Sequence, residues 1–145
     1  MSKTNTFENE LLLLVFNNTD IALIGDAAGL QNSAAAGSLY VSLHTADPAE
    51  AGAQNTSEIS YTGYARVAVA RSGAWTVTGN SVSPAAAITF GAMTAGAGGT
   101  VTHFGVGTDV SGAGKLLYKG TVTPNIVVSN GVTPQLTTAT AITED

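Results

Sequence analysis

The sequence has few charged residues. Only 10% of its 145 residues are Asp, Glu, Lys or Arg, whereas soluble domains usually carry about 25%. Residues 72–108 contain no formal charge, with His103 as their one titratable side chain, and residues 120–143 contain no formal charge either. Charged side chains normally stop strand edges from pairing with other molecules. Two interpretations are therefore open: other subunits cover much of this surface, or the chain is a secreted or thermally robust β domain with a Thr, Ser and Asn surface.

Cysteine and cations are also scarce. The absence of cysteine excludes a disulfide framework and thiol catalysis. The net charge is −5, and the cations are Lys3, Arg66, Arg71, Lys115 and Lys119. So few cations cannot neutralise the phosphates of a duplex, so no nucleic-acid partner is expected.

Long apolar runs are missing as well. The longest, residues 11–16, is far shorter than the roughly 20 residues needed to span a bilayer. No basic stretch followed by an apolar region and a cleavage site opens the chain. These features predict no membrane partner and synthesis in the cytoplasm.

What is present predicts a mainly β fold. Residues 1–145 are expected to form a single domain, with an N-terminal α-helix over 6–16, a connector over 17–37 and an antiparallel β-sandwich or jelly roll over 38–145. Alternating residues and Gly-rich turns predict about eight short strands. Their ranges are 39–44, 64–71, 74–78, 81–83, 87–90, 101–107, 115–122, 126–129 and 135–143.

The helix signals are local. Asn5 is expected to cap the helix together with Glu8, and Asn17-Asn18 to end it. A second short helix is predicted around residues 21–24. The helix is apolar on more than one face, which predicts either deep burial in its own domain or one face packed on a neighbouring subunit. In the second case the partner interface is predicted at Leu11, Leu12, Leu14, Val15 and Phe16. Deleting residues 1–16 is then expected to spare the sandwich and weaken association.

No motif predicts catalysis, a metal or a cofactor. The Gly-rich segment 105–115 departs from a phosphate loop, because Asp109 stands at its first glycine position and Leu116 where a hydroxyl would hold magnesium. It is interpreted as a strand connection. His44 and Asp47 could share a metal, but two ligands do not make a site, and both His44 and His103 are expected to be hydrogen-bonded structural residues. No nucleophile elbow is present. We therefore predict that the protein is not an enzyme.

Several sequence blocks together resemble a known family. They are residues 7–12, 39–48 (Leu-Tyr-Val-Ser-Leu-His-Thr-Ala-Asp-Pro), 62–69, 86–90, 101–105 and 130–145. In order and spacing they resemble small virion structural proteins of tailed bacteriophages, which are labelled head-decoration or tail-fibre-like. Residues 17–37 look longer than in those relatives, so no role is carried over to them.

The resemblance implies a virion component without catalytic residues. The first hypothesis is a capsid decoration protein that forms a homo-oligomer and bridges subunits of the major capsid protein at the capsid surface. The alternative is a tail-fibre or baseplate module, either purely structural or binding a host glycan. For the glycan, the loop over residues 49–62 with Asn55, Tyr61 and Tyr64 is the candidate site.

Overall fold

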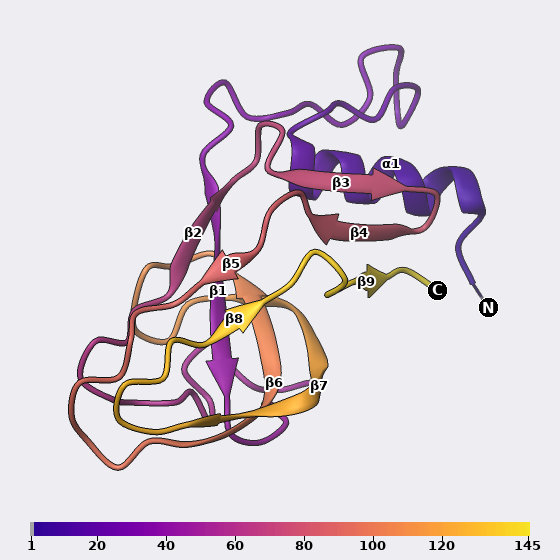
Figure 1. Ribbon diagram of the computed structural model, residues 1–145. Helices are drawn as coiled ribbons and strands as arrows, with labels where there is room; N and C mark the ends of the chain where they lie inside the picture. The colour runs from indigo at the N-terminus through magenta and orange to yellow at the C-terminus, as the bar shows by residue number, and fades with distance from the viewer. Residues whose placement is uncertain (1) are drawn as a thin grey trace. The chain divides into compact units, whose positions relative to one another are not determined.

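The computed structural model describes residues 2–145, which form one helix and nine strands (Figure 1). The elements are α1 (Asn5–Asn17), β1 (Ser38–His44), β2 (Val67–Ala70), β3 (Trp75–Thr78), β4 (Ser81–Pro84), β5 (Ile88–Thr89), β6 (Gly99–Gly107), β7 (Leu116–Val128), β8 (Gln135–Leu136) and β9 (Ile142–Thr143). The sheets have the strand orders β2-β1-β6-β7, β3-β4-β9 and β5-β8. The pairs β1–β6, β6–β7, β3–β4, β4–β9 and β5–β8 are antiparallel. The predicted fold class, mainly β with antiparallel sheets after one N-terminal helix, is confirmed.

The chain folds into two compact units. Unit 1 comprises Met1–Ser38, Val69–Ala86 and Thr138–Asp145, and unit 2 comprises Leu39–Ala68 and Ala87–Thr137. The chain therefore passes between the units at four points. The predicted single domain over 1–145 stays a prediction.

Unit 1 is built around α1, which packs on β3 and β4. Leu12 and Phe16 are fully buried, and the Phe16 ring meets Trp75 edge-on with the ring centroids 4.8 Å apart. The N-cap is Thr4, whose hydroxyl accepts a hydrogen bond from the Phe7 amide, so the prediction of Asn5 as the cap is wrong by one residue. The cause is that Thr4 keeps an extended backbone and already supplies the capping oxygen. The predicted end is confirmed, because Asn18 adopts the left-handed conformation that closes a helix.

The connector contains no helix around residues 21–24, so that prediction is wrong. Instead Ile21 and Leu30 pair in an antiparallel bridge, with both backbone N–H···O contacts between them at 2.8–3.0 Å. The turn between them is closed by Asp26, whose carboxylate accepts from the amides of Ala28 and Gly29. An aspartate that binds its own downstream amides favours a turn over a helix.

In unit 2, β1 is buried on both faces, although the alternation of apolar and polar residues over 39–44 is typical of a half-buried strand. Leu39, Val41 and Leu43 are buried as expected, but Ser42 and His44 are also completely buried. The reason is tertiary: residues 49–62 fold back over this face, and His44 bridges to Glu58 across it. Alternation along one strand cannot reveal a loop that returns from elsewhere.

The C-terminal strands differ from prediction in length. The two strands predicted over 115–122 and 126–129 are one strand, β7, in which Val122–Asn125 fall out of register with β6. The segment over 135–143 is two short strands in different sheets, β8 paired with β5 and β9 paired with β4. β2 is also shorter than the predicted strand over 64–71 and begins only at Val67.

Candidate functional site

Arg66 is the centre of a buried polar network in unit 2. Its guanidinium makes a bidentate pair with the Glu58 carboxylate, with Nε–Oε1 at 2.8 Å and Nη2–Oε2 at 2.7 Å. It also donates to the backbone carbonyls of Asp109 at 2.8 Å and Gly112 at 2.6 Å. The side chains of Arg66 and Glu58 are only 2% and 14% exposed. The planar fork of arginine suits this geometry, and one side chain thereby fixes residues 108–112 to residues 58–66.

Two tyrosines extend the network into the core. The Tyr64 hydroxyl donates to Glu58 Oε1 at 2.8 Å and accepts from the Leu43 amide at 3.0 Å, and its ring stacks on Phe90. The Tyr61 hydroxyl donates to the Gly91 carbonyl at 2.8 Å. Burial raises the pKa of both phenols, so each stays a proton donor at neutral pH.

The glycan site stays a prediction, and two of its three candidate residues are at least half-buried. Tyr61 is 7% exposed and Tyr64 is half-buried with its hydroxyl already bonded on both sides, whereas a sugar-stacking platform needs open ring faces. Asn55 does lie exposed in the loop.

Gln54 fixes the same two loops from the other side. It is completely buried; its Nε2 donates to the Tyr40 carbonyl at 2.7 Å, and its Oε1 accepts from the Asp109 amide at 3.3 Å. Gly107 leaves the necessary room, because a Cβ there would lie 2.3 Å from the Gln54 amide carbon. Residues 108–115 are a strand connection between β6 and β7, as the sequence predicted.

His44 is a hydrogen-bonded structural histidine, as predicted. Its Nδ1 donates to the Thr56 carbonyl at 2.8 Å, so in the neutral ring Nε2 accepts from the Ser42 hydroxyl at 2.9 Å. Burial lowers the pKa of His44 below its ordinary 6.5 and outweighs the bond to Thr56, which acts in the opposite direction. His103 Nδ1 is likewise bonded, to the Thr102 hydroxyl at 2.9 Å.

This burial predicts a pH dependence of stability. Above pH 6.5 the ring is neutral in the folded and unfolded states, so His44 does not make the free energy of unfolding depend on pH. Below 6.5 the unfolded state takes up a proton before the folded state does, so the free energy of unfolding should fall as the pH decreases. The midpoint of urea unfolding, measured at about pH 7.5, 6.5 and 5.5, checks this pH dependence. His44→Gln should lower stability throughout but flatten the slope; equal slopes in both proteins would contradict the assignment.

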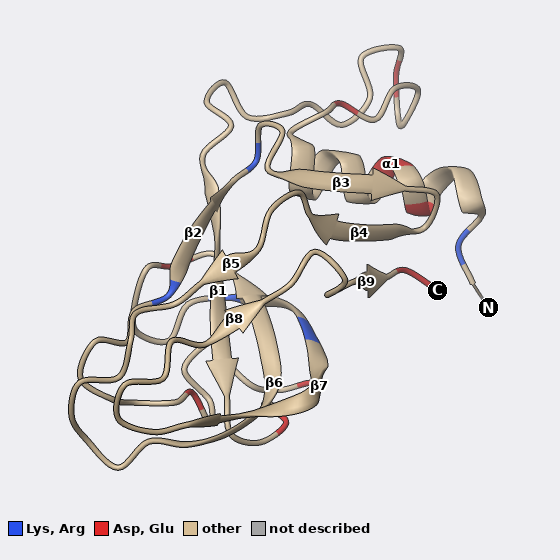
Figure 2. Cartoon of the chain, viewed as in Figure 1, with Lys and Arg blue, Asp and Glu red and all other residues tan. Residues whose placement is uncertain are grey.

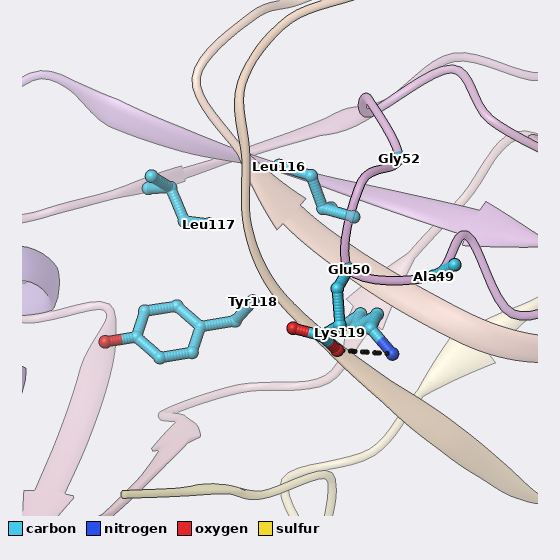
Figure 3. A pocket seen from close by; sticks show the side chains of 7 residues that line it. All are labelled: Ala49, Glu50, Gly52, Leu116, Leu117, Tyr118 and Lys119. Carbon is cyan, nitrogen blue, oxygen red and sulfur yellow. Dashed lines mark ion pairs between the residues drawn. The ribbon is translucent and has the colours of Figure 1, made fainter.

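A shallow hollow lies on the surface of unit 2, between the 49–52 loop and β7. It has a volume of about 250 Å³ and is lined by Ala49, Glu50, Gly52, Leu116, Leu117, Tyr118 and Lys119. Figure 3 shows Leu116 and Lys119 on the side of the strand that faces the loop, and Leu117 and Tyr118 on the other. Lys119 Nζ lies 2.9 Å from Asp47 Oδ1 and 3.2 Å from Glu50 Oε1.

The ion pairs of the hollow fasten the loop to β7. The hydrogen bond from Lys119 lowers the pKa of Asp47, and the bonds to Asp47 and Glu50 raise the pKa of Lys119, so Asp47 and Lys119 both remain charged at neutral pH. Asp47 therefore pairs with an ammonium group. Within residues 2–145 no group of three or more His, Cys, Asp and Glu side chains could hold a metal ion.

The predicted partner interface lies in unit 1, on α1. Leu12 and Phe16 are completely buried within the chain, so these two cannot contact another subunit. Leu11, Leu14 and Val15 are half-buried, and their interface role stays a prediction. In the described part of the chain, no helix is long and apolar enough to cross a membrane.

Sequence reasoning missed the network around Arg66. Arg66 was expected only as part of the strand over 64–71, and Glu58 and Gln54 were assigned no role. A usable signal was present: Arg66 is one of only two arginines and stands between apolar residues, where an arginine that is not paired would be costly.

A comparison with protein-family models gives a match over almost the whole chain. Residues 2–143 match the family described as Podophage GP4 fiber I protein gp80. Among curated proteins, none matches the chain.

Proposed function

The chain belongs to the podophage GP4 fiber I protein gp80 family and is a structural component of a tailed-phage virion, and from this premise we propose that it is a non-enzymatic subunit of a fibre. The single observation that carries the proposal is the family match, which spans residues 2–143 and bears the word fibre in its description.

The use of the polar side chains supports a structural role. The hydrogen bonds of Arg66, Glu58 and Gln54 hold the loops 49–62 and 108–115 against the sheet. Such buried networks fix one conformation of the loops they join. The result is a rigid surface, which suits a subunit that makes the same contacts at each symmetry-related position of an assembly.

The distribution of charge supports burial in an assembly. Figure 2 shows most of the ribbon free of charged residues, and residues 72–108 and 120–143 have none. Weak contacts repeated by symmetry can hold such subunits together without one deep pocket. A capsid decoration protein, with the major capsid protein as its partner, would also need an uncharged surface that other subunits cover. The family match favours the fibre over this alternative, because its description names a fibre protein.

The edge strand β7 is the proposed site of self-association. It ends the sheet β2-β1-β6-β7, runs for 13 residues and exposes Val127 to 66% and Leu117 to 36%. Long exposed edges invite pairing with another chain. Lys119 and Pro124 on this strand limit the pairing to part of its length.

We expect Val127→Lys to weaken self-association roughly tenfold or more, because it replaces an apolar contact with a charge that must be desolvated. Sedimentation velocity across a range of concentrations measures this. Val110→Lys, at another exposed valine (62%) outside the strand, is the matched control. If both variants associate like the wild type, β7 is not the contact.

Location in the particle tests the proposed function. Labelled antibody and quantitative mass spectrometry on intact virions are expected to place the protein on fibres at low copy number. Hundreds of copies on the head would establish capsid decoration instead. Binding of purified protein to a glycan array would support the host-glycan alternative, which now has only Asn55 of its predicted residues exposed.

A further inference from the structure

The connector carries an exposed apolar tip. Leu23 is 80% exposed, more than any other large apolar side chain of residues 2–145. Ile24 beside it is 39% exposed. Residues 22–28 are all exposed to solvent. In Figure 1 this loop stands out from α1 and β3, the neighbouring elements of unit 1.

The backbone of the tip is unusual. Leu23 has a φ of 66°, a left-handed conformation that leucine rarely adopts and that asparagine or glycine would occupy at lower cost. A leucine that is both exposed and conformationally unfavourable contributes little to folding of the isolated chain. Such outliers concentrate where a side chain has another task.

The stem below the tip is firmly held. Asn18 and Ser33 exchange two hydrogen bonds, and Asp20 accepts from the Asn32 amide at 2.6 Å. Arg71 donates to the carbonyls of Leu14 and Val15 in the last turn of α1 and to Ala36 at the far end of the loop. Gly29 allows the two arms to meet, because a Cβ there would lie 1.8 Å from the Ile21 carbonyl oxygen. The tip is therefore presented on a fixed stem.

The charge around the tip is negative. Asp20 and Asp26 are both exposed, and residues 17–37 contain no Lys or Arg. In Figure 2 the loop accordingly carries only red segments. A complementary surface would have an apolar pocket with a cationic rim.

A second copy of this chain cannot readily supply that rim. Lys3 and Lys119 are ion-paired, Arg66 is buried, and Arg71 is bound to backbone carbonyls. Of the five cations, all within residues 2–145, this leaves only Lys115 as an exposed candidate for the rim. The net charge of −5 also makes the approach of two copies at this loop repulsive.

We propose that residues 18–33 are a docking loop, in which Leu23 and Ile24 enter an apolar pocket with a Lys- or Arg-lined rim on a different protein of the virion. The inference rests on the virion role stated above and adds the surface and the chemistry of the partner. It is separate from β7, which lies in the other unit and serves self-association.

The test is incorporation into particles. Phage lacking the gene for this chain are complemented with wild type, Leu23→Asn or Val110→Asn, and the copies per particle are counted by quantitative mass spectrometry. Leu23→Asn keeps the left-handed backbone and should reduce incorporation roughly tenfold or more. Val110→Asn, an equally conservative change at an exposed apolar residue elsewhere, should incorporate normally. Equal melting temperatures of the purified variants rule out misfolding.

The charge component is tested by Asp20→Asn and Asp26→Asn, which keep the oxygen acceptors of the loop and remove only the charges. Both should reduce incorporation and make the remainder less sensitive to salt. A photo-cross-linking residue at position 23 should join the loop to a Lys- or Arg-bearing peptide of another virion protein.

The outcomes separate the two proposals. Absence of the wild-type chain from particles would overturn the virion role itself. Normal incorporation of Leu23→Asn, or cross-linking only to a second copy of this chain, would overturn the docking loop and leave the virion role intact.

Discussion

Arg66→Met is expected to lower the free energy of unfolding by about 3–5 kcal/mol, because it leaves the Glu58 carboxylate, only 14% exposed, without its counter-ion. It also removes the donors for the carbonyls of Asp109 and Gly112. Urea unfolding followed by tyrosine fluorescence measures the loss, since all four tyrosines lie in unit 2. Amide hydrogen exchange over residues 108–115 should speed up in parallel.

Two controls define the cause. Replacing both partners, Arg66→Met with Glu58→Leu, should cost less than the single change, because no charge then remains buried. Lys119→Met breaks ion pairs that are exposed and should leave the unfolding free energy almost unchanged. A double variant as unstable as the single one would show that the lost hydrogen bonds, and not the buried charge, dominate.

Phe16→Ala is expected to cost about 3–5 kcal/mol, the usual cost of emptying a buried aromatic site. The side chain is completely buried and its ring lies edge-on to Trp75. Because Trp75 is the one tryptophan of the chain and lies in unit 1, its fluorescence should shift even before unfolding. Urea unfolding followed at the tryptophan wavelength gives the energy.

Leu11→Ala is the matched control on the same helix. Leu11 is only half-buried, so the change should cost clearly less than Phe16→Ala, and a reduced self-association would support the interface predicted there. Equal losses for both would mean that the helix is buried on all sides. The burial of Leu12 and Phe16 also revises the expected effect of deleting residues 1–16: the deletion removes core side chains of unit 1 and should unfold it.

Local signals in the sequence were sufficient for the elements but not for their surroundings. The end of α1 followed from Asn17-Asn18, and the strand after residue 38 followed from alternation. The burial of Ser42 and His44 could not follow, because it depends on a loop that returns from residues 49–62. The segment 135–143 looked continuous, yet its two halves pair with different strands, β5 and β4, in different sheets.

The candidate site shows the same division. The guanidinium of Arg66 predicts a carboxylate partner, and Glu58 lies only eight residues away. Its other acceptors are carbonyls 43 and 46 residues downstream, in a loop whose side chains give no sign of the contact. Every residue has a backbone carbonyl, so the sequence does not reveal which carbonyls accept these hydrogen bonds. The contact between the two loops could therefore be found only from the structure.

The meeting of the two chain ends in unit 1 has a mechanical consequence. Lys3 Nζ lies 3.0 Å from Glu144 Oε2 and donates to the Asp145 carbonyl, and β9 holds the C-terminal segment to β4 through only two residue pairs. Tension applied between the two ends would act first on the Lys3 contacts and on the β9–β4 pairing. While unit 1 stays intact, unit 2 lies on closed loops of the chain and bears no load. Under such tension the β9–β4 pairing would yield first, and unit 2 with its joined loops would keep its shape.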